Sequence, residues 1–197
     1  TDEPIHIDFL SISAHKVYGP KGVGALYIRH GNKLPAILHG GGQENDIRPG
    51  TENIPGIAGF GLAAQLATEK MAVNIEHILE LEKQFLFALT KNNIEFTLHC
   101  KSHIPGFMNI SFHNVQSKLL LMNLDMLGIA ISAGSACASG TLKASKVLLQ
   151  LGVSEKLASE SVRISLGKSH SKHDVDYAIE KITELIPRLQ KTSDINV

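Results

Sequence analysis

Cysteine is scarce in this sequence, and neither sign of charge is in excess. The 197 residues include 2 cysteines, too few for a disulfide framework. Lysine plus arginine number 19, and aspartate plus glutamate also number 19. A broad nucleic-acid surface needs a cationic excess, so this balance argues against one. A reducing cytosol is the simplest compartment for such a chain.

Long apolar runs and targeting segments are lacking as well. No apolar stretch approaches the roughly 20 residues that a membrane-spanning helix needs. The chain opens on the acidic segment Thr1-Asp2-Glu3-Pro4, not on the basic and then apolar segment of a signal peptide. We therefore expect no membrane span and no secretory signal. A β-rich stretch follows at once, so we expect the sequence to begin inside a domain.

The first part of the chain predicts two strands, a long loop and a long helical segment. Residues 5–13 and 22–30 are strand-like, and the turn between them contains Gly-Pro and Lys-Gly. Residues 38–56 form a loop rich in glycine and proline, and long loops inside compact domains are often functional. Helical spacing then extends over 57–92, as one long helix or two abutting ones.

After residue 93, short strands alternate with helices. We expect strands at 94–100, 108–112, 129–134 and 162–167, and helices near 116–127, 143–151, 154–160 and 171–190. Gly128 stands where the first of these helices would be capped. Ser171 and Asp174 form a capping box at the start of the last one. The alternation predicts a compact α/β layer.

Lys16 ends the motif Ser-Ala-His-Lys at the end of the first predicted strand. A lysine amine is nucleophilic only when neutral, so a Schiff-base lysine needs a partly desolvated site or a cationic neighbour. A strand end beside a Gly-rich turn could supply such a site, with Ser13 and His15 donating hydrogen bonds to a phosphate. The alternatives are an ordinary surface lysine at Lys16, and strand-end capping or simple exposure at Ser13 and His15.

Cys137 lies among small residues, in the segment Ala-Gly-Ser-Ala-Cys-Ala-Ser-Gly. A cysteine kept for packing usually has bulky apolar neighbours, whereas small neighbours favour the accessible, mobile loop that a reacting thiol needs. An unreactive cysteine in a flexible loop is the alternative. Cys100 ends an apolar strand pattern, and we expect it to be buried and inert.

Arg163 lies inside an apolar predicted strand, where a charge is costly unless it is paired. A guanidinium binds a carboxylate in a bidentate fork. Its partner is therefore either the carboxylate of a substrate or an aspartate or glutamate of the chain itself.

Ten histidines raise the question of a metal site. His99 lies close to His103 in the sequence, and His170 lies close to His173. Neither pair belongs to a Cys-x-x-Cys or His-Glu-x-x-His pattern. We expect no dedicated metal site.

Four segments occur in one order along the chain: SAHKVYGPKGVGALY, HGGGQENDIRPGTENIPGIAGFG, SAGSACASG and SVRISLG. Together they resemble the cysteine desulfurases of the nitrogen-fixation and iron–sulfur-assembly type, which are pyridoxal-phosphate enzymes of the class V aminotransferase superfamily. The resemblance extends from Ile7 to about Leu189. Each segment alone is a weak signal, but four in register are specific.

The resemblance implies a role for each matching residue. Lys16 would bind pyridoxal 5'-phosphate covalently, and Ser13 and His15 would bind the phosphate of that cofactor. Thr51 would reach the phosphate bound to the neighbouring subunit of a homodimer. Cys137 would attack the sulfur of L-cysteine and carry it as a persulfide.

The resemblance further implies that Arg163 binds the substrate carboxylate. The loop around Cys137, residues 133–143, would be mobile, so that the persulfide can reach an acceptor or scaffold protein for iron–sulfur or thio-cofactor assembly. The product would be L-alanine, and the enzyme would be cytoplasmic.

The resemblance also implies an α/β fold that corresponds to the C-terminal part of a fold-type I pyridoxal-phosphate enzyme. Residues 1–72 would end the large cofactor-binding domain, and residues 73–197 would form a small α+β C-terminal domain with the cysteine loop. In this family the histidine that stacks on the cofactor ring and the aspartate that pairs with its nitrogen precede the lysine. We therefore expect an N-terminal half to supply them, and little activity from this chain alone.

Two alternatives stay open. The chain could belong to a selenocysteine lyase or another class V enzyme, although simple transaminases have no need of Cys137. It could also be a non-catalytic fragment that acts as an interaction module.

Overall fold

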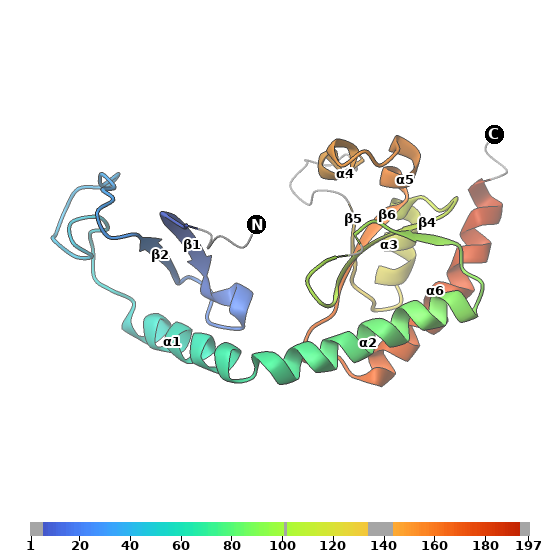
Figure 1. Ribbon diagram of the computed structural model, residues 1–197, viewed down its shortest axis with the longest axis horizontal. Coiled ribbons are helices and arrows are strands. Elements are labelled where there is room, and N and C mark those ends of the chain that lie inside the picture. The colour runs from blue at the N-terminus through green and yellow to red at the C-terminus, as the bar shows by residue number, and fades with distance from the viewer. Residues whose placement is uncertain (1–5, 101, 134–143, 194–197) are drawn as a thin grey trace. The chain divides into compact units, whose positions relative to one another are not determined.

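The computed structural model describes residues 6–100, 102–133 and 144–193, and the chain divides into two compact units (Figure 1). The first unit is Thr1–Met71 and the second is Ala72–Val197. The assignment of these units to a cofactor-binding domain and a small C-terminal domain stays a prediction.

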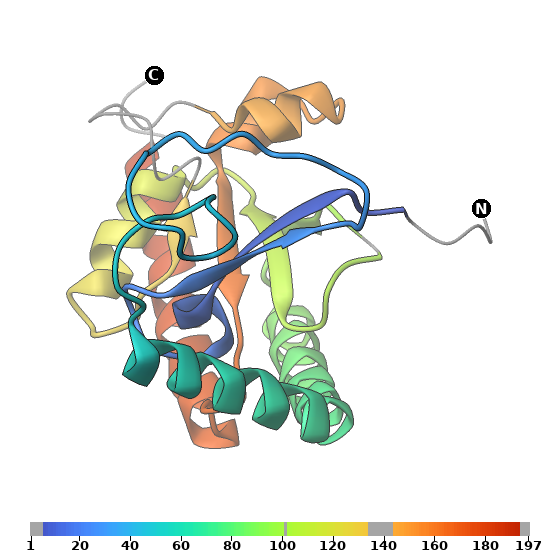
Figure 2. The ribbon, with the colours of Figure 1, turned by 90° about the vertical axis from the view of Figure 1, so that its left-hand side faces the viewer.

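A two-stranded antiparallel sheet lies at the centre of the first unit. Strand β1 (Phe9–Ser13) pairs with strand β2 (Gly24–Ile28), and both predicted strands are confirmed with shorter bounds. The 3-10 helix η1 (Ala14–Val17) follows β1 directly. Helix α1 (Ile54–Glu69) comes after the long loop, and Figure 2 shows it below the paired strands.

Two abutting helices, rather than one, occupy the predicted helical segment 57–92. Helix α2 (Met71–Lys91) begins almost where α1 ends. Helix α1 starts earlier than predicted because Asn53 caps it: its side-chain oxygen accepts a hydrogen bond from the amide of Gly56 at 3.2 Å. Pro55 in the first turn fits the same start. Amides in the first turn of a helix have no partner within the helix, so the missing amide hydrogen of proline costs nothing there.

The second unit is built on a four-stranded antiparallel sheet with the order β3-β4-β6-β5. The strands are β3 (Phe96–Leu98), β4 (Phe107–Phe112), β5 (Ser132–Ala133) and β6 (Ser161–Ser165). The helices after β4 are α3 (Ser117–Asp125), α4 (Lys146–Gln150), α5 (Glu155–Ser159) and α6 (Lys172–Ser193). Each strand and helix predicted after residue 93 is therefore confirmed within a few residues.

The two faces of this sheet differ because successive side chains of a strand point to opposite faces. One face is apolar and packs with helices α2, α3 and α6, of which α2 and α6 lie side by side (Figure 1). The core residues of this layer include Phe85, Leu89, Met108, Ile110, Phe112, Leu120, Leu124, Val162, Ile164, Ile182 and Ile186. The opposite face carries polar side chains, among them Arg163.

Local signals end and start the helices of this unit. Asn93, Gly128 and Gly152 follow helix ends with left-handed φ values of 54°, 76° and 82°. In each case the next amide donates to a carbonyl five residues earlier, at 2.9 to 3.0 Å. The capping box is confirmed too: the Ser171 amide donates to the Asp174 carboxylate at 2.7 Å, and the Asp174 amide donates to the Ser171 hydroxyl at 3.2 Å.

Candidate functional site

The turn that contains Lys16 is held by backbone hydrogen bonds on both sides. Ala14 is fully buried, its amide donates to the carbonyl of Val23 at 3.1 Å, and its carbonyl accepts from the amide of Gly19 at 2.8 Å. Tyr18 ends η1 with a φ of 64°, a left-handed conformation that is uncommon for a bulky residue. The backbone on either side of Lys16 therefore has little freedom.

Small residues let helix α1 approach this turn closely. A Cβ atom at Gly19 would lie 3.0 Å from the Ala14 carbonyl oxygen and 3.2 Å from the Cβ of Ala63 on α1. A Cβ at Gly59 of α1 would lie 2.7 Å from the ring of Pro20. Larger side chains at either glycine would push α1 away, so Gly19 and Gly59 allow the lysine turn to pack against the helix.

Ser13, His15 and Lys16 place three different polar groups at the end of β1. Ser13 is half-buried and makes no side-chain capping bond to η1, while His15 and Lys16 are exposed. Within the part of the chain that the structure describes, none of the three side chains has a hydrogen-bond or ion-pair partner. A hydroxyl, an imidazole and an amine that are uncommitted at one strand end are the donors and the nucleophile that a phosphorylated aldehyde needs. This donor set fits pyridoxal phosphate.

Thr51 lies on the loop that leads into α1, and this loop is shaped by local hydrogen bonds. Nη1 of Arg48 donates to the carbonyls of Gly50 and Thr51, at 2.9 and 3.3 Å. The Gly50 amide donates to Oε1 of Gln43 at 3.0 Å, and Gly50 has a φ of 99°. Thr51 is exposed. Its predicted contact with the phosphate of a neighbouring subunit is not tested and stays a prediction.

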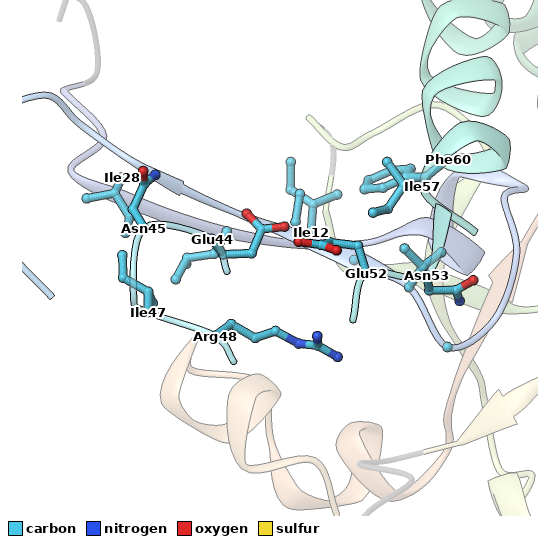
Figure 3. Close-up of a pocket in the computed structure, with 15 residues that line it drawn as sticks. Ile12, Ile28, Glu44, Asn45, Ile47, Arg48, Glu52, Asn53, Ile57 and Phe60 are labelled. Atoms are coloured by element: carbon cyan, nitrogen blue, oxygen red, sulfur yellow. The ribbon is translucent and has the colours of Figure 1, made fainter. Parts of the chain in front are cut away.

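The first unit has a cavity of about 820 Å³ beside the same loop (Figure 3). Ile12 of β1 and Phe60 of α1 contribute apolar surface to it, and Glu44, Arg48 and Glu52 contribute charged groups. Figure 3 shows the carboxylates of Glu44 and Glu52 pointing toward one another. None of the four predicted cofactor-binding residues lines this cavity, so the cavity and the lysine turn are neighbouring but distinct features.

The charged residues of this cavity were missed from the sequence, although their loop was predicted to be functional. Glu44, Asn45 and Asp46 have φ values of 50°, 55° and 65°, three left-handed residues in a row. Asparagine and aspartate tolerate this conformation better than other non-glycine residues do. An Asn-Asp pair shortly after three glycines was therefore the available signal for a tightly wound loop.

Arg163 lies in β6 between the buried residues Val162 and Ile164, but its own side chain is exposed on the polar face. Its Nη2 donates to the hydroxyl of Ser132 at 3.2 Å, and its Cζ lies 5.3 Å from the centre of the Phe107 ring. Among the described residues no carboxylate forms an ion pair with it. The alternative of an internal Asp or Glu partner therefore finds no support in the described chain.

The structure describes one of the two cysteines, Cys100, and not the other. Cys137 lies outside the described residues. So does the predicted mobile loop, residues 133–143, except for its first residue, Ala133, which ends β5. Cys100 is described and is exposed, so the prediction that it is buried is wrong. Strand β3 is an edge strand and stops at Leu98, so Cys100 falls in the connection to β4 instead of inside the sheet.

Three of the four paired histidines have hydrogen-bond partners among the described residues. His99 bonds to the Ser111 hydroxyl at 2.6 Å, and burial lowers the pKa of its imidazole below the ordinary value. His103 bonds to the Glu82 carboxylate at 2.9 Å, and the amide of Gly167 donates to the ring of His170 at 2.8 Å. Groups of three or more side chains suited to a metal ion are not found among the described residues. The described helices also include none that is long and apolar enough to cross a membrane.

Known sequences match nearly the whole chain. The sequence model of the family "Aminotransferase class-V" matches residues 3–178. The chain is 42% identical over 193 residues to "Cysteine desulfurase IscS" of Dictyoglomus turgidum, and 38% identical over 192 residues to the protein of that name from Methanosarcina thermophila. Each alignment covers 97% of this chain, but 49% and 48% of the relative. The chain thus spans about half the length of the curated relatives it matches.

Solved structures agree. A "NifS-like protein" superposes with a TM-score of 0.81 at 34% identity, over 93% of this chain and 47% of that one. The NifS-like protein from Rickettsia africae gives a TM-score of 0.80 at 32% identity, over 91% and 47%. The predicted α/β fold, as about half of a protein of this type, is confirmed.

Proposed function

Because this chain belongs to the class-V aminotransferase family, we propose that it is part of a pyridoxal-phosphate-dependent cysteine desulfurase. The observation that carries the proposal is the constrained turn at Lys16, with the uncommitted side chains of Ser13 and His15 beside it. The whole enzyme would act in the cytoplasm as a homodimer. It would convert L-cysteine to L-alanine and pass the sulfur to an acceptor protein of iron–sulfur or thio-cofactor assembly.

In the first unit, the residues of the lysine turn would hold the cofactor. Pyridoxal phosphate, when bound, supplies an electron sink for the carbon skeleton of an amino acid. The Lys16 amine would hold the cofactor covalently and, when free, would move the proton at the substrate Cα. The Ser13 hydroxyl and the His15 imidazole would bind the phosphate, and Thr51 would bind the phosphate of the neighbouring subunit.

In the second unit, Arg163 would bind the substrate carboxylate through its fork of N–H donors. The Cys137 thiolate would attack the substrate sulfur. An S–S bond forms as the Cβ–S bond breaks, and the electron pair of the broken bond stays with the carbon skeleton, which leaves as alanine after it takes up a proton. The rest of the relatives' length would supply the remaining contacts to the cofactor ring.

Borohydride reduction of the complete, cofactor-loaded protein followed by peptide mapping tests the role of Lys16. The covalent label is expected on Lys16, because this lysine is seated at the strand end beside Ser13 and His15. Lys21 and Lys33 are the internal controls. A label on either of them in place of Lys16 would contradict the assignment.

Two serine variants test the roles of the cysteines. Cys137→Ser should keep the visible absorption of the bound cofactor and lose persulfide formation, since the thiol acts on sulfur after the substrate is bound. Cys100→Ser is the matched control and should behave as the unmodified protein. Loss of sulfur release in Cys100→Ser alone would reverse the assignment. An absence of cofactor absorption in the complete protein would favour a non-catalytic interaction module.

A further inference from the structure

The polar face of the second unit's sheet places Arg163 in a row of cross-strand neighbours. The register sets Asn109 of β4 opposite Arg163 of β6, and Arg163 opposite Ser132 of β5. Residues directly opposite each other in an antiparallel pair share a face of the sheet. Phe107 precedes Asn109 by two positions on β4, so it lies on that face too. The guanidinium therefore has neighbours from the strand on each side.

Two of these neighbours contact the guanidinium in different ways. Ser132 accepts a hydrogen bond from Nη2 at 3.2 Å. The Phe107 ring lies under the group, with its centre 5.3 Å from Cζ, which is within the range of a cation–π interaction. The Phe107 side chain is large and apolar but 47% exposed, so it contributes little to the core. Its main described contact is the one with the guanidinium.

Both contacts are with neutral groups, and they leave most of the guanidinium available. The group has five N–H donors, of which Ser132 engages one and the aromatic ring engages none. Its positive charge has no carboxylate partner among the described residues. An arginine held on one side by a ring and at one corner by a hydroxyl keeps an edge free for a planar anion, which is the geometry of bidentate carboxylate binding.

We propose that Phe107 and Ser132 are positioning residues that orient Arg163 for the carboxylate of an amino-acid substrate. The identity of that substrate rests on the proposed function, whereas the orientation of the guanidinium does not. Fixing the long side chain before binding reduces the entropy that is lost when the carboxylate docks. The contribution is to binding rather than to the chemistry at sulfur, so it affects KM and leaves kcat unchanged.

The first experiment compares Phe107 variants in the complete, cofactor-loaded protein. Phe107→Leu keeps an apolar side chain but removes the aromatic face, and should raise KM for L-cysteine about two- to fivefold with kcat unchanged. Phe107→Tyr keeps the face and should restore the original KM. Phe87→Leu is the matched control, since Phe87 on α2 is 70% exposed and makes no cation–π contact among the described residues. It should change neither constant.

Ser132→Ala probes the second contact in the same way. The variant should raise KM for L-cysteine by a few-fold, about as much as Phe107→Leu, because the guanidinium loses its only described hydrogen-bond partner. Ser165→Ala, on the same face of β6, is its control and should leave KM unchanged. If Phe107→Leu and Ser132→Ala both leave KM unchanged in an active protein, the proposal is overturned.

A binding measurement separates this inference from the proposed function. L-alanine carries the carboxylate and ethylamine lacks it, and both can be titrated by the change in cofactor absorbance. Phe107→Leu should weaken L-alanine about two- to fivefold and leave ethylamine unchanged. If this difference holds in a protein that releases no sulfur from cysteine, the proposed function fails and the inference stands. Equal weakening of both ligands overturns the inference.

A third readout needs neither substrate nor cofactor. The ring current of Phe107 should shift the NMR signal of the Arg163 side-chain N–H, and this shift should disappear in Phe107→Leu and persist in Phe107→Tyr. An Arg163 signal that is the same in all three proteins would show that the ring does not hold the guanidinium.

Discussion

The two units of this chain bury very different amounts of apolar side chain. In the second unit the sheet and three helices enclose a core in which Phe112, Leu120 and Val162 are fully buried. In the first unit, Ala14 is the only buried apolar side chain among the described residues. Large apolar side chains of its paired strands are exposed: Phe9, Leu10, Ile12, Leu26 and Tyr27.

The difference indicates which unit depends on contacts with other polypeptide. A two-stranded sheet is at best marginally stable alone in water. Exposed apolar side chains on both faces of such a sheet are typical of a surface that further structure covers. The alignment with the curated relative from Dictyoglomus turgidum covers 49% of that relative, so that protein has further polypeptide beyond the matched part. We infer that the second unit is stabilised by its own core, whereas the first relies on contacts from outside that unit.

The largest effect that would test this comparison comes from truncating one phenylalanine in each unit. Phe112→Ala removes a fully buried ring and should lower the free energy of unfolding of the second unit by about 3–5 kcal/mol. Phe9→Ala removes a ring that is 47% exposed in this chain, and should cost about 1 kcal/mol or less. Urea denaturation of this 197-residue chain measures both.

The same pair of variants in the complete protein sharpens the comparison. If other polypeptide covers β1 in the complete protein, the loss in free energy of unfolding caused by Phe9→Ala should rise toward the loss caused by Phe112→Ala. Equal small costs in the short chain and in the complete protein would contradict the inference that the first unit is covered.

Buried carboxylates give the next effect, and both are in the second unit. Glu82 is 8% exposed, accepts from the Gly106 amide at 2.7 Å and bonds to His103 at 2.9 Å. Glu160 is 5% exposed, and its Oε2 has no hydrogen-bond partner among the residues that the structure describes. Glu82→Ala should lower the free energy of unfolding of the second unit by about 3 kcal/mol, because it leaves buried donors unpaired. Glu160→Met should leave that free energy unchanged or raise it by about 1 kcal/mol.

Thermal denaturation at one fixed pH compares these two variants. A Glu160→Met protein that is destabilised as much as Glu82→Ala would show that the Glu160 carboxylate has a partner. Glu82→Gln is the matched control for Glu82→Ala, since it keeps one acceptor oxygen, and it should lose less stability.

The smallest expected effect is a pH dependence at His99. Burial lowers the pKa of His99 below its ordinary value of 6.5, so the unfolded chain takes up a proton at this group more readily than the folded chain does. The contribution of His99 to stability is therefore complete above about pH 6.5 and declines as the pH falls below it. His99→Gln keeps a donor for Ser111 and should reduce the loss of stability between about pH 7 and pH 5. An unchanged pH profile of urea denaturation would contradict this.

Much of the local structure could be predicted from the sequence, because the responsible signals act within a few residues. The Ser171 and Asp174 capping box and the left-handed Gly128 lie where their patterns predict them. The start of α1 was predicted late, although Asn53 and Pro55 signalled it locally. The lysine turn was likewise predicted from a short motif.

Other features depend on contacts between residues that are far apart in the sequence. The exposure of Cys100 follows from the point at which β3 stops pairing with β4, and a local apolar pattern does not encode that point. Gly19 is tightly packed because Ala63 of α1 lies against it. That Arg163 lies in a strand follows from the local sequence, whereas its exposure on the polar face is seen in the structure. Strand register alone decided that its neighbours are Phe107 and Ser132, because each comes from a different strand and side-chain pairing across a sheet is set when the strands align.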